Sequence, residues 1–249
     1  MLSIKKENIA VILVLPENPD NIGAAARAVK NMGFSILRLV KPPRQWRTKA
    51  KKMAMSADDI LESTNEFSSL REAIQDLGLV IGTTRRTGGH RGAFLPFDRT
   101  VSKIRGNSLR QKVGIVFGRE SKGLENEDSA LCDHLVTIPT GHAYPSINLA
   151  QAVMIMLFAL SWGRETSQEI FPERVLNKKE IEGTITCFEA ALKALGYKKG
   201  GADLLPRILK TFRGLLKRSG LWEPEAQMIK GLSRKIREKV LSYPRARVK

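Results

Sequence analysis

The residues best placed to do chemistry stand just before an apolar helical segment. Ser146 and Asn148 follow Pro145 and precede an apolar run over residues 152–160. Both side chains are good helix N-caps, and the first N–H groups of a helix have no partner inside it. This end of the predicted helix therefore suits an electron-rich small ligand. An ordinary capped core helix is the alternative interpretation of the stretch on its own.

The carboxyl ends of two predicted strands hold a second group of candidate residues. Gly118 and Glu120 follow the apolar residues 113–117, and a Thr-Thr-Arg sequence follows residues 79–82. Open α/β sheets bind ligands at this edge, where Gly118 would let a ligand approach the backbone closely. Neither segment matches a Walker A loop or a dinucleotide-binding fingerprint. Taken alone, each glycine or threonine is more simply a turn residue.

Arg27 stands out because it lies among four alanines, in a predicted helix over residues 22–32 that Asn21 caps and Gly33 closes. A guanidinium does not lose its charge, so it needs a partner. A structural salt bridge, for example to Glu120, is one interpretation. The other is a bidentate contact to a phosphate, which suits the fork of the side chain.

The composition narrows the class of protein. With 249 residues, 42% of them hydrophobic, the chain can bury one large core or two smaller ones. Its net charge of +17 points to a polyanionic partner, a nucleic acid before an acidic membrane. The two cysteines fit no disulfide or metal pattern, and the charged residues 1–8 do not resemble a signal peptide. We therefore expect a cytoplasmic protein that binds no metal.

Two basic segments adjoin the predicted pocket. Residues 38–52 contain seven Lys and Arg and no acidic residue, and residues 85–92 are basic and rich in glycine. Charge runs usually mean only a solvated face, but cationic loops beside a pocket favour contact with RNA. The residues expected to make this contact are Arg44, Arg47, Lys49, Arg86 and Arg91, with Arg38 and Lys41 in the same run.

Strand-like and helix-like segments alternate through the first two thirds of the chain, which argues for a mostly parallel α/β sheet. The expected strands are residues 9–15, 36–40, 79–82, 113–117 and 135–138. Further helices are expected near residues 57–62, 68–77 and 126–131. Because the apolar pattern ends near residue 163, we expect a domain at 1–164, a linker at 165–177 and an extension at 178–249.

The extension is expected to be all helical, with helices over residues 178–195, 204–218 and 225–240. Residues 198–249 hold 15 Lys and Arg against 4 Asp and Glu. Arg207, Arg213 and Lys217 belong to the polar face of the middle helix, whose other face carries apolar residues at helical spacing. We expect the extension to grip RNA; a bundle that only supports a dimer is the alternative.

Three segments resemble the signature motifs of one family of RNA-modifying enzymes. They are LPENPDNIGAAARA at residues 15–28, GIVFGRESKGL at 114–124 and SINLA at 146–150. Their order and spacing are similar to those of the SPOUT superfamily of RNA methyltransferases, in its TrmH-like 2′-O-ribose branch and closest to the TrmJ type. The resemblance covers residues 8–162 strongly and continues more loosely through the C-terminal third.

The resemblance implies a SPOUT fold with a C-terminal trefoil knot, although knots are otherwise essentially absent from proteins. It also implies that S-adenosylmethionine binds in the knot, mostly through backbone groups, and leaves as S-adenosylhomocysteine. The residues that would line this pocket are Thr83, Thr84, Arg85, Gly118, Ile138, Pro145, Ser146, Ile147 and Leu149.

The same resemblance implies that Arg27, Glu120, Ser146 and Asn148 serve catalysis in a homodimer, where Arg27 of one subunit meets the cofactor loop of the other. We expect Arg27 to position the substrate rather than abstract a proton, because a guanidinium keeps its proton near neutral pH. For Glu120, holding Arg27 and orienting the loop are both open. For Asn148, helix capping, ordering of the loop and contact with the ribose are open.

The implied reaction is 2′-O-methylation of tRNA, at anticodon-loop nucleotide 32. In-line transfer of a methyl group to an oxygen needs positioning and charge stabilisation more than a metal. Methylation of ribosomal RNA is the nearest alternative. A non-catalytic RNA-binding factor with the same fold is an alternative from another class.

Overall fold

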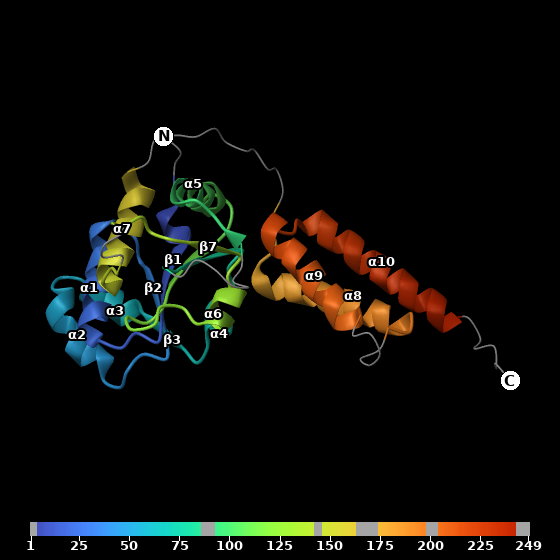
Figure 1. The fold of residues 1–249 in the computed structure, drawn as a ribbon, viewed down its shortest axis with the longest axis horizontal. Helices are drawn as coiled ribbons and strands as arrows, with labels where there is room; N and C mark the ends of the chain where they lie inside the picture. The colour runs from blue at the N-terminus through green and yellow to red at the C-terminus, as the bar shows by residue number, and fades with distance from the viewer. Residues whose placement is uncertain (1–3, 86–92, 142–145, 163–173, 198–203, 243–249) are drawn as a thin grey trace. The chain divides into compact units, whose positions relative to one another are not determined.

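The computed structural model describes residues 4–85, 93–141, 146–162, 174–197 and 204–242 (Figure 1). The expected residues Arg86, Arg91 and Pro145 lie outside this part of the chain. The chain divides into two compact units, Met1–Phe171 and Pro172–Lys249. The first unit is built on a sheet and the second on helices.

The N-terminal unit contains one sheet of seven parallel strands in the order β3-β2-β1-β6-β4-β7-β5. All six residues of β1 are buried, as expected for a strand covered on both faces. The prediction of a mostly parallel α/β sheet is confirmed. The strands are β1 (Ile9–Val14), β2 (Ile36–Val40), β3 (Asn65–Phe67), β4 (Leu79–Thr83), β5 (Ala93–Phe94), β6 (Val113–Phe117) and β7 (His134–Val136).

Helices cover both faces of this sheet. One hydrophobic cluster packs α1, α2, α3, α5 and α7 on one face, and a second cluster, with Leu70 and Ala73, packs α4 and α6 on the other. A short 3₁₀ helix at Lys6–Asn8 precedes β1. The helices are α1 (Pro19–Asn31), α2 (Trp46–Ala54), α3 (Asp58–Ser63), α4 (Leu70–Ala73), α5 (Phe97–Ser108), α6 (Asn126–Leu131) and α7 (Leu149–Trp162).

Helix α1 begins earlier than expected. Its N-cap is Asn18, whose side chain accepts from the backbone N–H of Asp20 at 2.9 Å, and Pro19 occupies the first turn. Asn21 therefore lies inside the helix, and its side chain is available for contacts elsewhere. Gly23 in α1 faces the backbone of α2 so closely that a Cβ would collide with Ala50.

Other boundaries also differ from those expected. Helix α4 is a single turn that Ser69 caps, whereas a helix over residues 68–77 was expected. Strand β7 pairs with β4 from His134, one residue earlier than expected. Five elements were not expected at all: the 3₁₀ helix at Lys6–Asn8, α2, α5 and the short strands β3 and β5.

The C-terminal unit consists of α8 (Lys178–Ala194), α9 (Leu204–Ser219) and α10 (Glu223–Ser242). Asn177 and Glu180 form a capping box at the start of α8. Buried side chains including Leu176, Ile185 and Leu216 make up its core. Within the described residues, no helix of either unit is both long and apolar enough to cross a bilayer.

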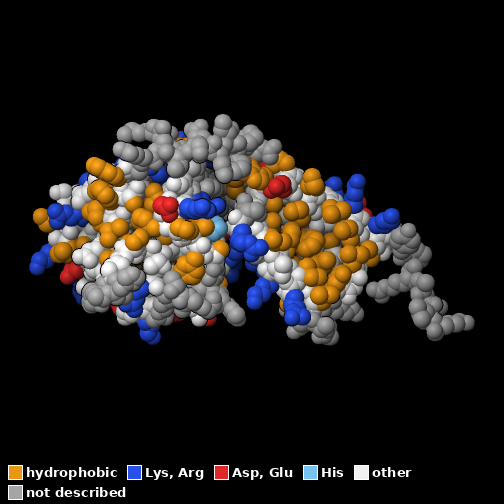
Figure 2. All heavy atoms as spheres, turned by 45° about the horizontal axis from the view of Figure 1, so that its top comes forward, with side chains coloured by type: hydrophobic (Ala, Val, Ile, Leu, Met, Phe, Trp, Pro, Cys, Tyr) orange, Lys and Arg blue, Asp and Glu red, His pale blue; other side chains and the backbone are white. Residues whose placement is uncertain are grey.

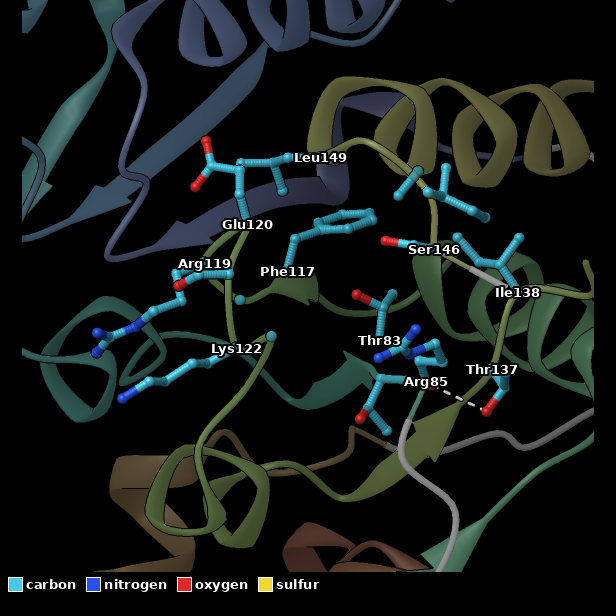
Figure 3. A pocket seen from close by; sticks show the side chains of 16 residues that line it. Thr83, Arg85, Phe117, Arg119, Glu120, Lys122, Thr137, Ile138, Ser146 and Leu149 are labelled. Carbon is cyan, nitrogen blue, oxygen red and sulfur yellow. Dashed lines mark hydrogen bonds between the residues drawn. The ribbon is translucent and has the colours of Figure 1, made fainter. Parts of the chain in front are cut away.

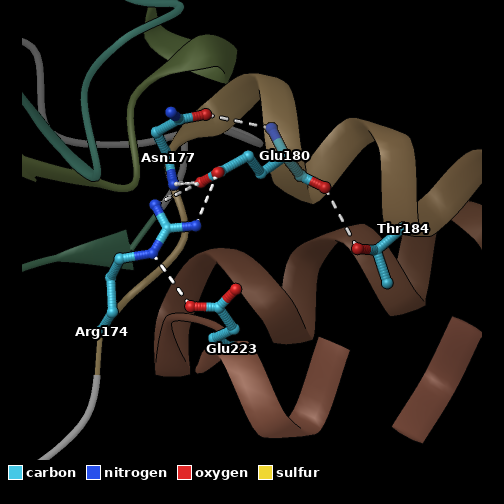
Figure 4. A network of polar contacts seen from close by, with 5 residues as sticks. All are labelled: Arg174, Asn177, Glu180, Thr184 and Glu223. Carbon is cyan, nitrogen blue, oxygen red and sulfur yellow. Dashed lines mark hydrogen bonds and ion pairs between the residues drawn. The ribbon is translucent and has the colours of Figure 1, made fainter. Parts of the chain in front are cut away.

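Arg174 ties the start of the C-terminal unit together (Figure 4). Its guanidinium donates to Glu180 at 2.8 Å and to Glu223 at 3.1 Å. The backbone of Leu176 also donates to Leu221 at 2.8 Å. Residues 174–177, which we had expected to be part of a linker, therefore belong to this unit.

Candidate functional site

A pocket lies at the carboxyl ends of β4, β6 and β7, beside the start of α7 (Figure 3). In Figure 3, Arg119, Glu120 and Lys122 lie along one side, and Ser146, Ile138 and Thr137 along the other. Four separate stretches of the sequence thus meet at one edge of the sheet. The pocket is lined by all the described residues that we expected to bind a cofactor: Thr83, Thr84, Arg85, Gly118, Ile138, Ser146, Ile147 and Leu149.

Gly118 starts a tight loop on one side of the pocket. The backbone N–H of Gly123 donates to the carbonyl of Arg119 at 2.8 Å and closes the loop. A Cβ on Gly118 would collide with the backbone of Gly123 and Leu124. We expected this glycine to make room for a ligand, but the space is filled by the loop itself.

Threonine side chains hold the opposite side of the pocket. Thr83 donates from Oγ1 to the carbonyl of Val116 at 3.0 Å, and Thr137 donates from Oγ1 to the carbonyl of Thr84 at 2.9 Å. The backbone N–H of Thr84 donates to the carbonyl of Val136 at 2.9 Å. These hydroxyl groups fix strand ends, which leaves backbone groups of the loops as natural contacts for a ligand.

Glu120 orients the loop that leads into α1. Its carboxylate accepts from the backbone N–H groups of Glu17 at 2.8 Å and Asn18 at 3.2 Å. It also accepts from the side-chain amide of Asn21 at 2.7 Å. Among the described residues Glu120 makes no contact with Arg27, so these contacts support the other alternative, that Glu120 orients the loop.

Asn148 caps α7 and also reaches α1. Its Oδ1 accepts from the backbone N–H groups of Ala150 at 2.9 Å and Gln151 at 3.4 Å. Its amide donates to Oδ1 of Asn21 at 2.9 Å. Asn21 therefore connects Glu120, on one side of the pocket, with the helix start on the other side. Asn148 therefore both caps α7 and orders the loop before it.

Arg27 is exposed on α1 and does not line the pocket of its own chain. Among the described residues it makes no hydrogen bond or ion pair. The salt bridge considered for it is therefore absent from this part of the structure, and its guanidinium is available to an external partner. Ser146 is also exposed and does line the pocket.

Glu17 and Ser121 are site residues that the sequence did not reveal. The carboxylate of Glu17 accepts from the hydroxyl of Ser121 at 2.5 Å and from its backbone N–H at 3.3 Å. Both residues belong to the motif segments, but no local pattern pairs two residues that are 104 positions apart. Only the parallel pairing of β1 with β6 brings their loops together.

The basic run at residues 38–52 divides into buried and exposed parts. Arg38 belongs to the run but does not face solvent: it is 8% exposed and donates to both carboxylate oxygens of Asp76, at 2.6 and 2.9 Å. The hydrogen bond from Arg38, helped by Lys112, holds the pKa of Asp76 well below its usual range. Arg44 and Lys49 are exposed.

Arg47 is half-buried, between the buried Arg38 and the exposed Arg44 and Lys49. Its guanidinium donates to the carbonyl oxygens of Leu61 at 2.5 Å and Thr64 at 3.0 Å, and lies 4.6 Å from the ring centroid of Trp46. These contacts occupy much of its donor capacity, so it has little left for a phosphate. The expectation that Arg47 binds RNA rests on its exposed edge alone.

The basic residues of α9 are also unequal. Arg213 donates to both carboxylate oxygens of Glu182 at 3.0 Å, and this pairing raises the pKa of its guanidinium. Arg207 is exposed, and Lys217 is half-buried. Arg207 is therefore the better placed of the two arginines to bind a polyanion.

Within the described residues, no group of three or more His, Cys, Asp or Glu side chains is arranged to hold a metal ion. The expectation of metal-free chemistry stays a prediction. Burial raises the pKa of Asp128 in α6, and Glu125 and Glu127 add to the effect. This carboxyl does not line the pocket, so we give it no role there.

Comparison with known proteins agrees with the architecture of the site. A sequence profile of the SpoU rRNA Methylase family matches residues 8–158. The tRNA (cytidine-2′-O-)-methyltransferase TrmJ of Methanocaldococcus jannaschii is 38% identical over 176 residues, which are 68% of this chain and 70% of that protein. The tRNA (cytidine/uridine/adenosine-2′-O-)-methyltransferase TrmJ of Pseudomonas aeruginosa is 30% identical over 96% of this chain and 98% of its own length.

A solved structure extends the likeness beyond the N-terminal unit. The crystal structure of TrmJ from Z. mobilis ZM4 superposes with a TM-score of 0.75 at 32% identity, over 91% of this chain and 98% of that one. The chain belongs to the SpoU rRNA methylase family of the SPOUT superfamily, and within it to the TrmJ type.

Proposed function

We propose that this chain transfers a methyl group from S-adenosylmethionine to a ribose 2′-hydroxyl of tRNA, at nucleotide 32 of the anticodon loop. The observation that carries the proposal is the pocket at the carboxyl ends of β4, β6 and β7, which is lined by two of the three motif segments, 114–124 and 146–150. The names of the TrmJ relatives from M. jannaschii and P. aeruginosa support tRNA as the substrate. We place the activity in the cytoplasm.

The residues of the pocket fit the cofactor. The turn at residues 118–123 and the irregular segment at residues 137–138 offer backbone groups on opposite sides, and Ile138 and Leu149 offer apolar surface between them. Thr83, Thr84 and Arg85 would hold one end of the cofactor. Ser146 and Ile147 would hold its other end. The cofactor, when bound, supplies the methyl group on its sulfonium.

Three of the four candidate catalytic residues act by position. The side chains of Glu120 and Asn148 form the hydrogen bonds that fix the loops. We therefore assign neither of them the role of taking the proton of the 2′-hydroxyl. Arg27 carries a fork that suits an RNA phosphate, and a positive charge that stabilises a developing alkoxide. Ser146 faces the pocket and would contact the ribose or the cofactor.

A homodimer would complete the site. Arg27 does not line the pocket of its own chain, so it must meet a cofactor in another copy if it serves this reaction. Helix α7, which packs against α1, exposes three large apolar side chains: Ile155 (39%), Phe158 (48%) and Trp162 (77%). The rings of Phe158 and Trp162 stack at 5.5 Å. Exposed apolar side chains gathered on one helix mark a surface for protein association.

The C-terminal unit would hold the RNA backbone. Helix α9 carries five Lys and Arg and no acidic residue, and Arg207 and Lys210 are exposed on it. Figure 2 shows Lys and Arg side chains on the surface of both units, and a broad hydrophobic area on this one. Arg44 and Lys49 of the N-terminal unit, together with Arg86 and Arg91, would extend the cationic path.

The test is methyl transfer in vitro. Purified protein is incubated with S-adenosylmethionine labelled in the methyl group and with unmodified tRNA or ribosomal RNA, and 2′-O-methylated positions are mapped by resistance to alkaline cleavage. The proposal predicts label in tRNA at nucleotide 32. Label only in ribosomal RNA would support the nearest alternative. Binding of RNA without transfer or binding of S-adenosylhomocysteine would support a non-catalytic factor.

A further inference from the structure

The loop of residues 118–123 is held to the segment before α1 by a closed ring of hydrogen bonds. Glu17 donates its backbone N–H to Glu120 at 2.8 Å, and its own carboxylate accepts from the hydroxyl and the N–H of Ser121. Each segment thus supplies both a donor and a carboxylate acceptor to the other. Both oxygens of the Glu17 carboxylate are used on one residue of the pocket loop.

The ring joins the two parts of the proposed site. On one side, Ser121 and its neighbours Lys122 and Gly123 line the pocket. On the other side, the residue after Glu17 is the N-cap of α1, the helix that carries Arg27. A change in the loop is therefore passed to the start of α1 through a few hydrogen bonds.

The backbone before Glu17 is also constrained. Leu15 has a φ of 50°, a left-handed conformation that a bulky residue adopts only when its surroundings impose it. Its N–H donates to the carbonyl of Val40 at 2.9 Å, and Pro16 follows. The segment is thus set in one conformation before it meets the loop, so the position of the Glu17 carboxylate is defined.

We propose that Glu17 is a positioning residue that holds the loop of residues 118–123, through Ser121, in the shape that binds the cofactor. This inference rests on the proposed function. Glu17 and Ser121 are both exposed, and exposed pairs contribute little to global stability. The contribution of Glu17 is therefore expected in cofactor binding and not in the stability of the fold.

The direct test is calorimetric titration of S-adenosylhomocysteine into the full-length protein. Glu17→Ala should weaken binding by about tenfold, the scale of a lost hydrogen bond to a charged group. Ser121→Ala should weaken it less, because the backbone N–H of residue 121 still donates to the Glu17 carboxylate. The double variant should bind about as weakly as Glu17→Ala alone, because the Ser121 hydroxyl acts only through Glu17. Glu62→Ala, which removes an exposed carboxylate on α3, is the matched control and should bind like the wild type.

A conservative variant and the kinetics separate positioning from general damage. Glu17→Gln keeps an acceptor for the Ser121 hydroxyl but presents an N–H group to the Ser121 N–H, so it should recover only part of the affinity. In Glu17→Ala, the KM for S-adenosylmethionine should rise while the KM for tRNA and the melting temperature stay unchanged. A merely structural role would instead lower kcat with the folded fraction and leave both KM values alone.

The outcomes separate this inference from the proposed function. If the wild type does not bind S-adenosylhomocysteine, the proposed function is contradicted. If the wild type binds and Glu17→Ala binds equally well, only the role of Glu17 is overturned. Additive losses in the double variant would likewise overturn it, because the two side chains would then act separately.

Discussion

The pocket loops and the C-terminal helices are held in place by contacts of very different range. In the N-terminal unit, Ser121 meets Glu17 across 104 positions of sequence, and Asn148 meets Asn21 across 127. In the C-terminal unit, the capping box joins residues three apart, and Arg174 meets Glu180 six positions away. The site therefore depends on hydrogen bonds that span more than a hundred positions, whereas the helical unit combines local caps with bonds of intermediate range, such as Arg213 to Glu182 and Arg174 to Glu223.

The largest effect is expected at Arg27, which belongs to the N-terminal unit but has no partner among its described residues. Arg27→Ala should lower methyl transfer by about 10²-fold or more, the scale for losing a charge-stabilising group. Arg27→Lys keeps the charge but loses the fork, so it should restore little. Binding of S-adenosylhomocysteine should stay unchanged. Arg71→Ala, which removes an exposed arginine of α4, is the matched control.

The next effect concerns the tight loop at Gly118. Gly118→Ala places a Cβ against the backbone of Gly123 and Leu124, and the forced shift should weaken S-adenosylhomocysteine binding by about tenfold or more. Gly106→Ala in α5 meets nothing within 4 Å and is the control. Circular dichroism should show both variants folded. Unchanged affinity in Gly118→Ala would mean that the shape of this loop does not matter for the pocket.

A third effect concerns stability rather than chemistry. Asp76→Asn removes the carboxylate partner of the buried Arg38 and should lower the free energy of unfolding by about 2 kcal/mol at neutral pH, a value reduced for the half-exposed carboxylate. Denaturation by urea measures it, with Glu62→Gln as control. A stability equal to that of the wild type would mean that Arg38 finds other partners.

The same pair predicts a pH dependence. Because the pKa of Asp76 is depressed in the folded state, its stabilising contribution is present above the ordinary value of 3.8 and is lost as the pH falls below it. The difference in unfolding free energy between wild type and Asp76→Asn should therefore shrink as the pH falls below about 4. A difference that stays constant down to pH 2 would contradict the linkage.

The smallest effect tests the helical unit. Arg207→Gln should reduce the salt dependence of tRNA binding by about one unit of slope, the value for one lost phosphate contact. Arg213→Gln should reduce it less, because Glu182 already occupies that guanidinium. Filter binding at several salt concentrations measures both. Equal slopes in the two variants would remove the distinction between paired and unpaired arginines.

The sequence predicted what depends on local pattern and on motifs. Strands β2 and β6 were placed to the residue, because each is a compact apolar run. Helix α2 was missed because its N-cap, Gln45, is in a left-handed conformation and gives no capping signal. Strands β3 and β5 have three and two residues, too few for an alternating pattern to show.

The sequence predicted which residues line the candidate site but not which of its residues are hydrogen-bonded to one another. The expected cofactor residues that are described line one pocket, since motif positions identify them. The partners of Glu120 were not foreseen, because Glu17, Asn18 and Asn21 reach it only through the pairing of β1 with β6. The true start of α1 was missed for a local reason: two asparagines three residues apart can both cap a helix, and Pro19 favours Asn18.

The central claim is that one copy supplies the cofactor pocket and another supplies Arg27. The most direct test mixes Arg27→Ala with Gly118→Ala under conditions in which subunits exchange, at a cofactor concentration low enough to leave the Gly118→Ala pocket largely empty, so that each variant alone has little activity. Heterodimers would pair an intact pocket of one copy with an intact Arg27 of the other, so methyl transfer to tRNA should partly return. If heterodimers form and no activity returns, Arg27 acts within its own chain or takes no part in the reaction, and the account is contradicted.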